Sequence, residues 1–252
     1  MQETAGRLSC ADGAALAWRR VAGEGPTVLW LGGFRSDMAG IKAGFLAEQA
    51  AAKGWDFLRF DYSGHGESDR AFEDGTIGRW RDDALLVLDR LVEGPALLVG
   101  SSMGGWIACL VALARPERVK ALALIAPAAD FTAKLMEPEF DAAAHRTLET
   151  DGRWIRASAY DPEGYPITRA LIEDGRRWNI LDAPVPIRCP VGILQGEADS
   201  DVPWRHALRL HEALQSSDAA FTLVRDADHS FSRPQDLARL VATVAELREA
   251  AR

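Results

Sequence analysis

The chain has 252 residues, of which 48% are hydrophobic and 26% charged, and its formal net charge is −8. This size and composition are typical of one α/β domain with a large core. The acidic balance excludes the basic surface that nucleic-acid binding needs, and it argues against an anionic membrane surface as a partner.

Cysteine and targeting patterns limit the class of protein further. No stretch approaches the roughly 20 apolar residues of a transmembrane helix, and the first residues lack the basic region and apolar run of a signal peptide. Cys10, Cys109 and Cys189 are odd in number and widely spaced, which predicts neither a disulfide framework nor a zinc site. We therefore expect free thiols and a cytoplasmic location.

Strand-like and helix-like segments alternate along the chain. In chain order, the predicted strands cover 7–10, 15–20, 27–31, 56–61, 96–100, 119–125, 191–195 and 220–225. The predicted helices cover 40–53, 77–91, 102–114, 203–215 and 234–250. This alternation predicts the α/β class, with a mostly parallel sheet that carries helices on both faces.

The alternation stops between residues 126 and 188, where we find helical patches and scattered aromatic residues but no strand-like run. We expect this segment to form an inserted helical cap over the sheet. Residues 1–125 and 189–252 would then form the core of the domain.

The segment Gly100-Ser101-Ser102-Met103-Gly104 links a predicted strand to a predicted helix. Gly-x-Ser-x-Gly in that context indicates a sharp strand-to-helix turn that exposes the serine hydroxyl at the top of a sheet. Glycines two residues to either side of Ser102 avoid clashes where the helix approaches the strand. Ser102 is therefore the candidate nucleophile; none of the three cysteines lies in such a turn.

A serine hydroxyl needs a base to take its proton, usually a histidine that a carboxylate orients. His229 follows the last predicted strand, so it should lie at the carboxyl edge of the sheet, where ligand sites form. Of the other downstream histidines, His145 falls in the predicted cap, and His206 and His211 fall in a helix, where we expect them at the surface. His229 is the candidate base.

Three acidic residues follow the strand 191–195: Glu197, Asp199 and Asp201. The arrangement Gly-x-x-Asp-x-x-Val-Pro favours Asp199 as the orienting carboxylate. Asp201 is the alternative, and its other interpretation is a solvated or helix-capping residue before Pro203. Glu197 is interpreted as solvated.

Catalysis by a serine also needs backbone N–H groups that stabilise the oxyanion. The residue after the nucleophile, Met103, supplies one. Phe34, in the loop after the strand 27–31, is the candidate for the other, because Gly32 and Gly33 let the backbone approach a substrate. His65, in a Gly-rich loop, is interpreted as structural.

Several motifs carry a family resemblance beyond these single residues. They are Phe60-Asp61-Tyr62-Ser63-Gly64, Gly100-Ser101-Ser102-Met103-Gly104-Gly105-Trp106, Ala114-Arg115-Pro116-Glu117 and Asp199-Ser200-Asp201-Val202-Pro203-Trp204. Over nearly its full length the chain resembles serine hydrolases of the α/β-hydrolase fold. More narrowly, it is similar to the family of a mammalian mitochondrial α/β-hydrolase-domain acyl-glucuronide esterase and protein S-depalmitoylase and its bacterial relatives. This chain has Gly32-Gly33 where that family has Pro-Gly, and it lacks a basic leader.

The resemblance implies an esterase or thioesterase that works through an acyl-enzyme on a Ser102–His229–Asp199 triad, without a metal or an organic cofactor. The implied substrate is a small-molecule ester or acyl-thioester, or an S-acylated protein, and the implied assembly is a monomer or homodimer. We expect the acyl pocket between the turn at Ser102 and the cap. Its candidate lining residues are Gly33, Trp106, Phe131, Met136, Trp154 and Trp178.

Two other functions would use the same residues. A carbon–carbon bond hydrolase or lyase on this fold would keep the triad, and a ligand-binding receptor could retain a slow one. A haloalkane dehalogenase would need an aspartate at position 102, so Ser102 excludes it.

Overall fold

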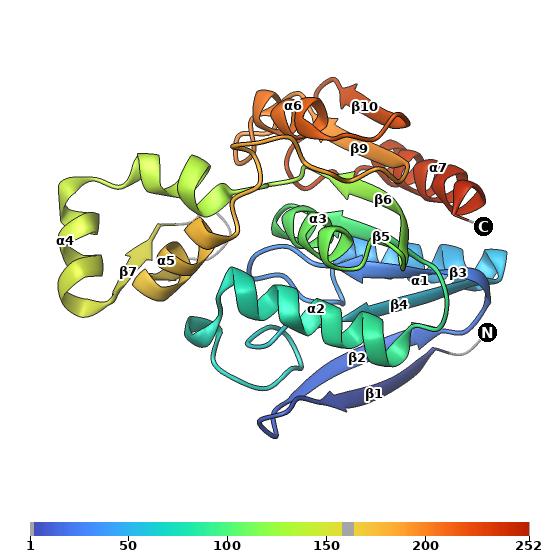
Figure 1. Cartoon of the computed structure of the whole chain (residues 1–252), viewed down its shortest axis with the longest axis horizontal. Helices are drawn as coiled ribbons and strands as arrows, with labels where there is room; N and C mark the ends of the chain where they lie inside the picture. Colours follow the sequence, from blue (N-terminus) through green and yellow to red (C-terminus); the bar gives the residue numbers. More distant parts are fainter. Residues whose placement is uncertain (1–2, 158–163, 252) are drawn as a thin grey trace.

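An eight-stranded sheet forms the centre of the molecule (Figure 1) in this computed structural model, which describes residues 3–157 and 164–251. The strands lie in the order β1-β2-β4-β3-β5-β6-β9-β10; β2 pairs antiparallel with both β1 and β4, and every other pairing in the sheet is parallel. Their bounds are β1 Thr4–Ser9, β2 Ala15–Val21, β3 Glu24–Leu31, β4 Trp55–Phe60, β5 Ala96–Ser101, β6 Val119–Ile125, β9 Val191–Gly196 and β10 Ala219–Val224.

Helices cover both faces of the sheet. Their bounds are α1 Ile41–Lys53, α2 Ile77–Leu91, α3 Met103–Ala114, α6 Trp204–Ala213 and α7 Pro234–Ala250. Buried residues of α1 and α7 pack into one hydrophobic cluster, and those of α2, α3 and α6 pack into a second cluster. Because both sides are covered, β4, β5 and β9 are buried at every residue. The predicted α/β-hydrolase class with a mostly parallel sheet is confirmed.

The direction of winding changes at β3, which lies between β4 and β5 although the chain visits β4 first. Ligand sites form at such a switch point, beyond the carboxyl ends of the strands. The chain leaves β3 at Gly32 and leaves β5 at Ser102, so the two segments meet at this point.

The segment between β6 and β9, which we call the cap segment (126–188), extends to the left of the sheet in Figure 1. It holds two short helical turns, followed by α4 Ala142–Asp151, β7 Arg153–Arg156, β8 Tyr165–Thr168 and α5 Arg169–Arg177. Residues 158–163 lie outside the described residues. The segment is not purely helical, because β7 and β8 pair antiparallel. Each of these strands has only four residues, too few for a clear alternation in sequence.

The two ends of the cap segment are joined at Asp130. Its buried carboxylate accepts hydrogen bonds from the backbone N–H groups of Ile180 (2.8 Å) and Leu181 (2.9 Å). Beside it, His206 Nε2 of α6 lies 2.7 Å from the carbonyl oxygen of Ala129. The expectation that His206 lies at the surface is therefore wrong: its ring is buried against the start of the cap segment.

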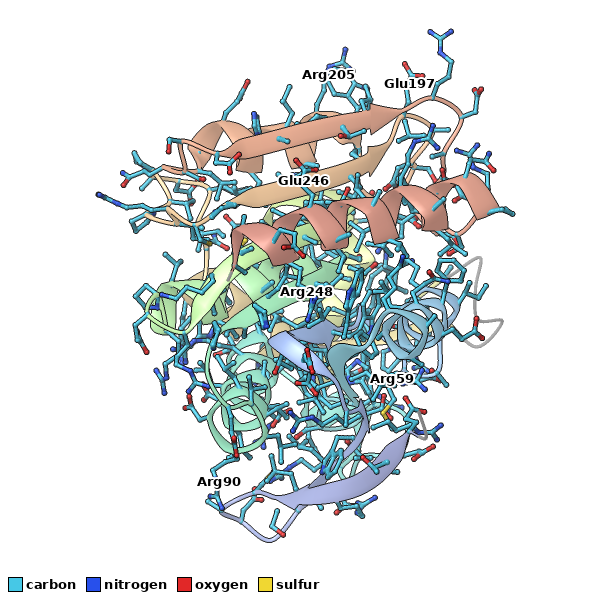
Figure 2. The ribbon with its side chains drawn as sticks, turned by 90° about the vertical axis from the view of Figure 1, so that its right-hand side faces the viewer. Arg59, Arg90, Glu197, Arg205, Glu246 and Arg248 are labelled. Atoms are coloured by element: carbon cyan, nitrogen blue, oxygen red, sulfur yellow. The ribbon has the colours of Figure 1, made fainter. Side chains whose placement is uncertain are left out.

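Two buried arginines connect neighbouring parts of the core. Figure 2 shows Arg59 and Arg248 within the body of the molecule, whereas Glu197 and Arg205 project from its upper margin. Arg248 of α7 lies over the Trp55 ring, 5.2 Å from its centroid. Arg59 of β4 donates to the Met38 carbonyl oxygen (2.9 Å), which holds the loop that follows β3. No helix in 3–157 or 164–251 is both long and apolar enough to span a membrane.

Candidate active site

Ser102 lies at the turn between β5 and α3 with φ 55° and ψ −119°, a conformation that side chains rarely adopt. The turn has no room for side chains at its glycines. A Cβ at Gly100 would lie 2.3 Å from the Gly104 carbonyl oxygen, and one at Gly104 would lie 2.0 Å from the Leu31 carbonyl oxygen. The Gly-x-Ser-x-Gly pattern thus reflects a close approach of α3 to β3 and β5.

His229 lies between Ser102 and Asp199. Its Nε2 is 3.1 Å from Ser102 Oγ, and its Nδ1 is 2.9 Å from Asp199 Oδ2. The Asp199 side chain is fully buried, whereas that of His229 is 21% exposed. Ser102 lies 127 positions and Asp199 lies 30 positions before His229 in the sequence. The three side chains nevertheless form one continuous hydrogen-bonded series.

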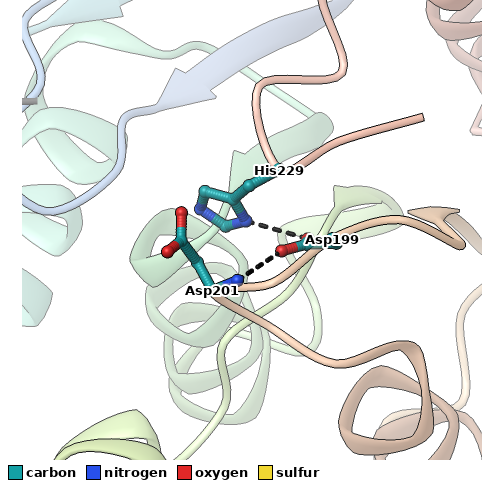
Figure 3. A group of neighbouring side chains, drawn as sticks. All are labelled: Asp199, Asp201 and His229. Carbon is teal, nitrogen blue, oxygen red and sulfur yellow. Dashed lines mark hydrogen bonds and ion pairs between the residues drawn. The ribbon is translucent and has the colours of Figure 1, made fainter. Parts of the chain in front are cut away.

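The Asp199 carboxylate is held by three further N–H donors. Its Oδ1 accepts from the backbone of Asp201 (3.0 Å) and Val202 (2.8 Å), and its Oδ2 accepts from Gln195 Nε2 (3.0 Å). In Figure 3 the Asp201 carboxylate points toward the imidazole, but the dashed line from His229 reaches Asp199. Asp199, rather than Asp201, thus contacts Nδ1.

Gly33, Phe34 and Met103 line the same cavity as Ser102. A Cβ at Gly33 would lie 3.5 Å from the Ser102 Cβ, so the backbone after β3 passes directly beside the serine. Among the described residues, the backbone N–H groups of Phe34 and Met103 have no hydrogen-bond acceptor. Both are therefore available to a ligand.

The loop that carries Phe34 is held by side chains that follow β4. His65 Nε2 accepts the Arg35 backbone N–H (3.2 Å), and Asp61 Oδ1 accepts that of Met38 (2.7 Å). His65 Nδ1 lies 3.2 Å from the Ser63 carbonyl oxygen, and burial lowers the pKa of this histidine to about 4. His65 is thus neutral at ordinary pH, with Nε2 as an acceptor. The sequence alone indicates a structural loop histidine but not this contact.

A cavity of about 550 Å³ opens beside Ser102 and His229. Of the residues expected to line an acyl pocket, Gly33, Phe131 and Met136 do so. Trp106, Trp154 and Trp178 are not among the described residues that line it. Trp106 is buried beneath Phe131, with ring centroids 5.7 Å apart.

The other two tryptophans also pack elsewhere: Trp154 contacts Phe140 at a centroid distance of 5.2 Å, and the Arg81 guanidinium lies over Trp178 at 4.6 Å. Two lining residues that the sequence does not single out are Lys42 and Tyr165. Lys42 is a single lysine in an ordinary helix, and Tyr165 lies in a strand too short to recognise. Neither belongs to a motif, so neither stands out in the sequence.

Known proteins match this chain over most of its length. The Hydrolase_4 family model, described as serine aminopeptidase S33, matches residues 26–170. Palmitoyl-protein thioesterase ABHD10, mitochondrial, of Mus musculus is 38% identical over 92% of this chain and 78% of its own length. The Homo sapiens protein of the same name is 36% identical over 92% of this chain and 76% of its own length.

Two solved structures have nearly the same fold. Mouse ABHD10 superposes with a TM-score of 0.90 at 36% identity, and 98% of each chain is covered. A structure from Agrobacterium vitis S4 superposes with a TM-score of 0.92 at 44% identity, again over 98% of each chain. These matches confirm the predicted resemblance and the predicted esterase or thioesterase class of enzyme.

The same relatives contradict one expectation. Their names describe them as mitochondrial, so the predicted cytoplasmic location is wrong. The expectation rested largely on free cysteines, which are weak evidence about location because they are not specific to one compartment. The family model and the relatives that match the chain nearly end to end establish that it belongs to the Hydrolase_4 α/β-hydrolases, in the family that includes ABHD10.

Proposed function

We propose that this protein hydrolyses carboxylic thioesters or esters through an acyl-enzyme, with Ser102 as nucleophile, His229 as base and Asp199 as the orienting carboxylate. The observation that carries the proposal is the continuous series from Ser102 Oγ through His229 to Asp199, with contacts of 3.1 Å and 2.9 Å at the cavity wall. Series of this kind serve acyl transfer on several unrelated folds.

The hydrogen bonds support one arrangement of protons in the proposed triad. An ionised carboxylate only accepts, so Asp199 fixes the proton on His229 Nδ1 and leaves Nε2 to accept from Ser102 Oγ–H. Ser102 Oγ then attacks the acyl carbonyl carbon while Nε2 takes the hydroxyl proton. Nε2 returns that proton to the departing thiolate or alkoxide as the bond to the leaving group breaks.

A water molecule releases the acyl group by the reverse sequence. Its proton goes to His229 Nε2, its oxygen attacks the acyl carbon, and Ser102 Oγ leaves with the proton from Nε2. The backbone N–H groups of Phe34 and Met103 would stabilise the oxyanion in both steps, since each such donor contributes about 3 kcal/mol to transition-state stabilisation.

The cavity supports a medium or long acyl group. Its apolar lining comes from the loop after β3, the start of α3 and the cap segment, namely Phe34, Met103, Ala128, Phe131, Leu135 and Met136. The relatives are named palmitoyl-protein thioesterases. We infer that an S-acylated protein or a small acyl-thioester is the substrate class, with acyl-glucuronide-like esters as the second candidate.

Labelling with a fluorophosphonate probe tests the proposal. The wild-type protein should be labelled and Ser102→Ala should not, while Ser101→Ala, one residue away on β5, should still be labelled. A series of acyl-thioesters and p-nitrophenyl esters of graded chain length would then define the acyl group. A folded wild-type protein that fails to react with the probe would refute a serine hydrolase and leave the ligand-binding alternative.

A further inference from the structure

The ring of Phe34, whose backbone N–H is one proposed oxyanion donor, is surrounded by four other aromatic rings. From the core, Phe72 and Trp80 contact it at centroid distances of 4.9 Å and 5.9 Å. From the cap segment, Phe131 and Tyr165 contact it at 5.7 Å and 6.1 Å. All four pairs are edge-to-face, an arrangement that aromatic rings favour. The core and the cap segment therefore hold this ring between them.

The next residue, Arg35, is held in the same way. Its guanidinium lies 5.1 Å from the centroid of the Phe72 ring and 5.3 Å from that of the Tyr165 ring. A cation is attracted to the negative face of an aromatic ring. Arg35 also has φ 55°, which a residue with a side chain keeps only where its surroundings hold it. The backbone directly after Phe34 is thus also held from both the core and the cap segment.

The core rings are fixed by contacts within the core. Trp80 of α2 is fully buried, and its Nε1 donates to the Ser63 carbonyl oxygen at 3.1 Å. The Phe72 ring stacks on Trp80 with a centroid distance of 5.9 Å and an interplanar angle of 29°. Tyr165, in contrast, lies on β8, which pairs with β7 in a separate two-stranded sheet. A movement of β8 would therefore reach the loop after β3 through Tyr165.

We propose that Tyr165 is a positioning residue, which packs against Phe34 and Arg35 and so holds the Phe34 backbone N–H in place to bind the oxyanion. The cap segment would then contribute to the chemical step as well as to acyl binding. This inference rests on the proposed hydrolase function. The backbone after β3 passes directly beside Ser102, and a misplacement of about 1 Å at such a site can cost on the order of 100-fold in rate.

Tyr165 also lines the cavity, so the test must separate positioning from contact with an acyl chain. An acetyl ester serves this purpose because it has no long acyl chain to contact the cap segment. Tyr165→Leu keeps an apolar side chain but removes the ring. We expect kcat and kcat/KM for p-nitrophenyl acetate to fall together by about five- to tenfold, since the lost contacts act in the transition state. Tyr165→Phe keeps the ring and should stay within about twofold of wild type.

Arg35→Met tests the same contact from the other side. Arg35 is exposed, so this variant should fold, and we expect its kcat for the acetyl ester to fall about threefold. When Arg35→Met is combined with Tyr165→Leu, the total loss should be smaller than the product of the two single losses, because both changes remove one shared contact. The rate of fluorophosphonate labelling should follow kcat, since the probe places an oxygen at the oxyanion site.

Phe140→Leu is the matched control for a general loosening of the cap segment. Within the described residues, the Phe140 ring contacts His145 and Trp154 rather than Phe34. This variant should lower the melting temperature but leave kcat for the acetyl ester unchanged. Tyr165→Leu should lower kcat even well below its own melting temperature.

The possible failures can be told apart. An unchanged kcat for the acetyl ester in Tyr165→Leu, with a raised KM for long acyl esters, would mean that Tyr165 only contacts the acyl chain and would overturn the positioning role. An equal loss of kcat in Phe140→Leu, or losses that multiply in the double variant, would also overturn it. A folded wild-type protein that fails to react with the probe would instead refute the hydrolase function itself.

Discussion

Asp199 and Asp201 lie two residues apart, yet their surroundings differ in a way that separates their roles. The Asp199 carboxylate is buried and contacts His229 Nδ1 at 2.9 Å, whereas the Asp201 side chain is exposed and its backbone N–H donates to Asp199. A carboxylate without solvent and with four N–H partners is held in one orientation. That orientation in turn fixes the tautomer of His229.

Exchange of each aspartate for asparagine tests this difference. Asp199→Asn presents an amide that can donate to Nδ1 and favour the wrong tautomer, so kcat should fall by roughly 10⁴-fold, as in other triads. Asp201→Asn should change kcat by less than about tenfold, because its side chain does not contact Nδ1. The measurement is kcat on one acyl-thioester; a larger loss in Asp201→Asn than in Asp199→Asn would reverse the assignment.

The glycines of the chain offer a matched test of backbone packing. Gly104→Ala would place a Cβ 2.0 Å from the Leu31 carbonyl oxygen, so we expect a loss of several kcal/mol in the free energy of unfolding, or failure to fold. At Gly44, in α1, a Cβ meets nothing within 4 Å. Gly44→Ala should therefore stabilise the protein by about 0.5–1 kcal/mol. Urea denaturation measures both, and equal effects would contradict the packing argument.

At the scale of elements, side chains of the loop after β4 hold the loop after β3 in position. His65 accepts the Arg35 backbone N–H. Arg35 directly follows the proposed oxyanion donor Phe34 in the sequence, and the φ of Arg35 is 55°. His65→Leu removes the acceptor, so kcat should fall about tenfold or more with KM nearly unchanged. His65→Gln, which keeps an acceptor, should recover part of the loss. A fall confined to thermal stability would contradict a role in positioning Phe34.

The same histidine makes stability depend on pH. The pKa of His65 is lowered from 6.5 to about 4 by burial, so the unfolded chain binds a proton that the folded chain does not between these values. The stability associated with neutral His65 is fully present above pH 6.5 and is lost as the pH falls toward 4. The total loss in the free energy of unfolding is about 3 kcal/mol. The free energy of unfolding of wild type minus that of His65→Gln, followed from pH 7 to 4, should show this slope.

The bounds 77–91, 119–125 and 234–250 agree with α2, β6 and α7. β6 is an apolar run, Thr76 caps the start of α2, and Pro234 begins α7, so local signals mark these elements. The strands β7 and β8 were not predictable, since four residues give no period and their pairing is tertiary. Likewise, the order Ser102, Asp199, His229 suggests a triad, but only packing brings Lys42 to the residue after His229 and His65 to the residue after Phe34.

At the scale of the whole molecule, residues of the core and of the cap segment line one cavity. The core supplies Ser102 and His229, and the cap segment supplies Phe131, Leu135 and Met136. The position of the cap segment relative to the core should therefore affect which acyl groups the cavity accepts. Trp106 of α3 helps to set it, because its Nε1 donates to the Trp178 carbonyl oxygen at 3.2 Å and its ring packs on Phe131.

Asp130 is the residue at which this arrangement can be loosened without touching the catalytic groups. Asp130→Ala would leave the Ile180 and Leu181 N–H groups without their acceptor and would force alanine to φ 57°, so it should cost about 2–4 kcal/mol. We expect faster proteolysis within 126–188. We also expect the substitution to raise KM more for esters of long acyl chains than for acetyl esters. Asp130→Asn, which tolerates this φ and keeps one acceptor, should show smaller changes of both kinds. Equal KM changes for short and long acyl chains would mean that the cap segment does not contribute to the acyl site.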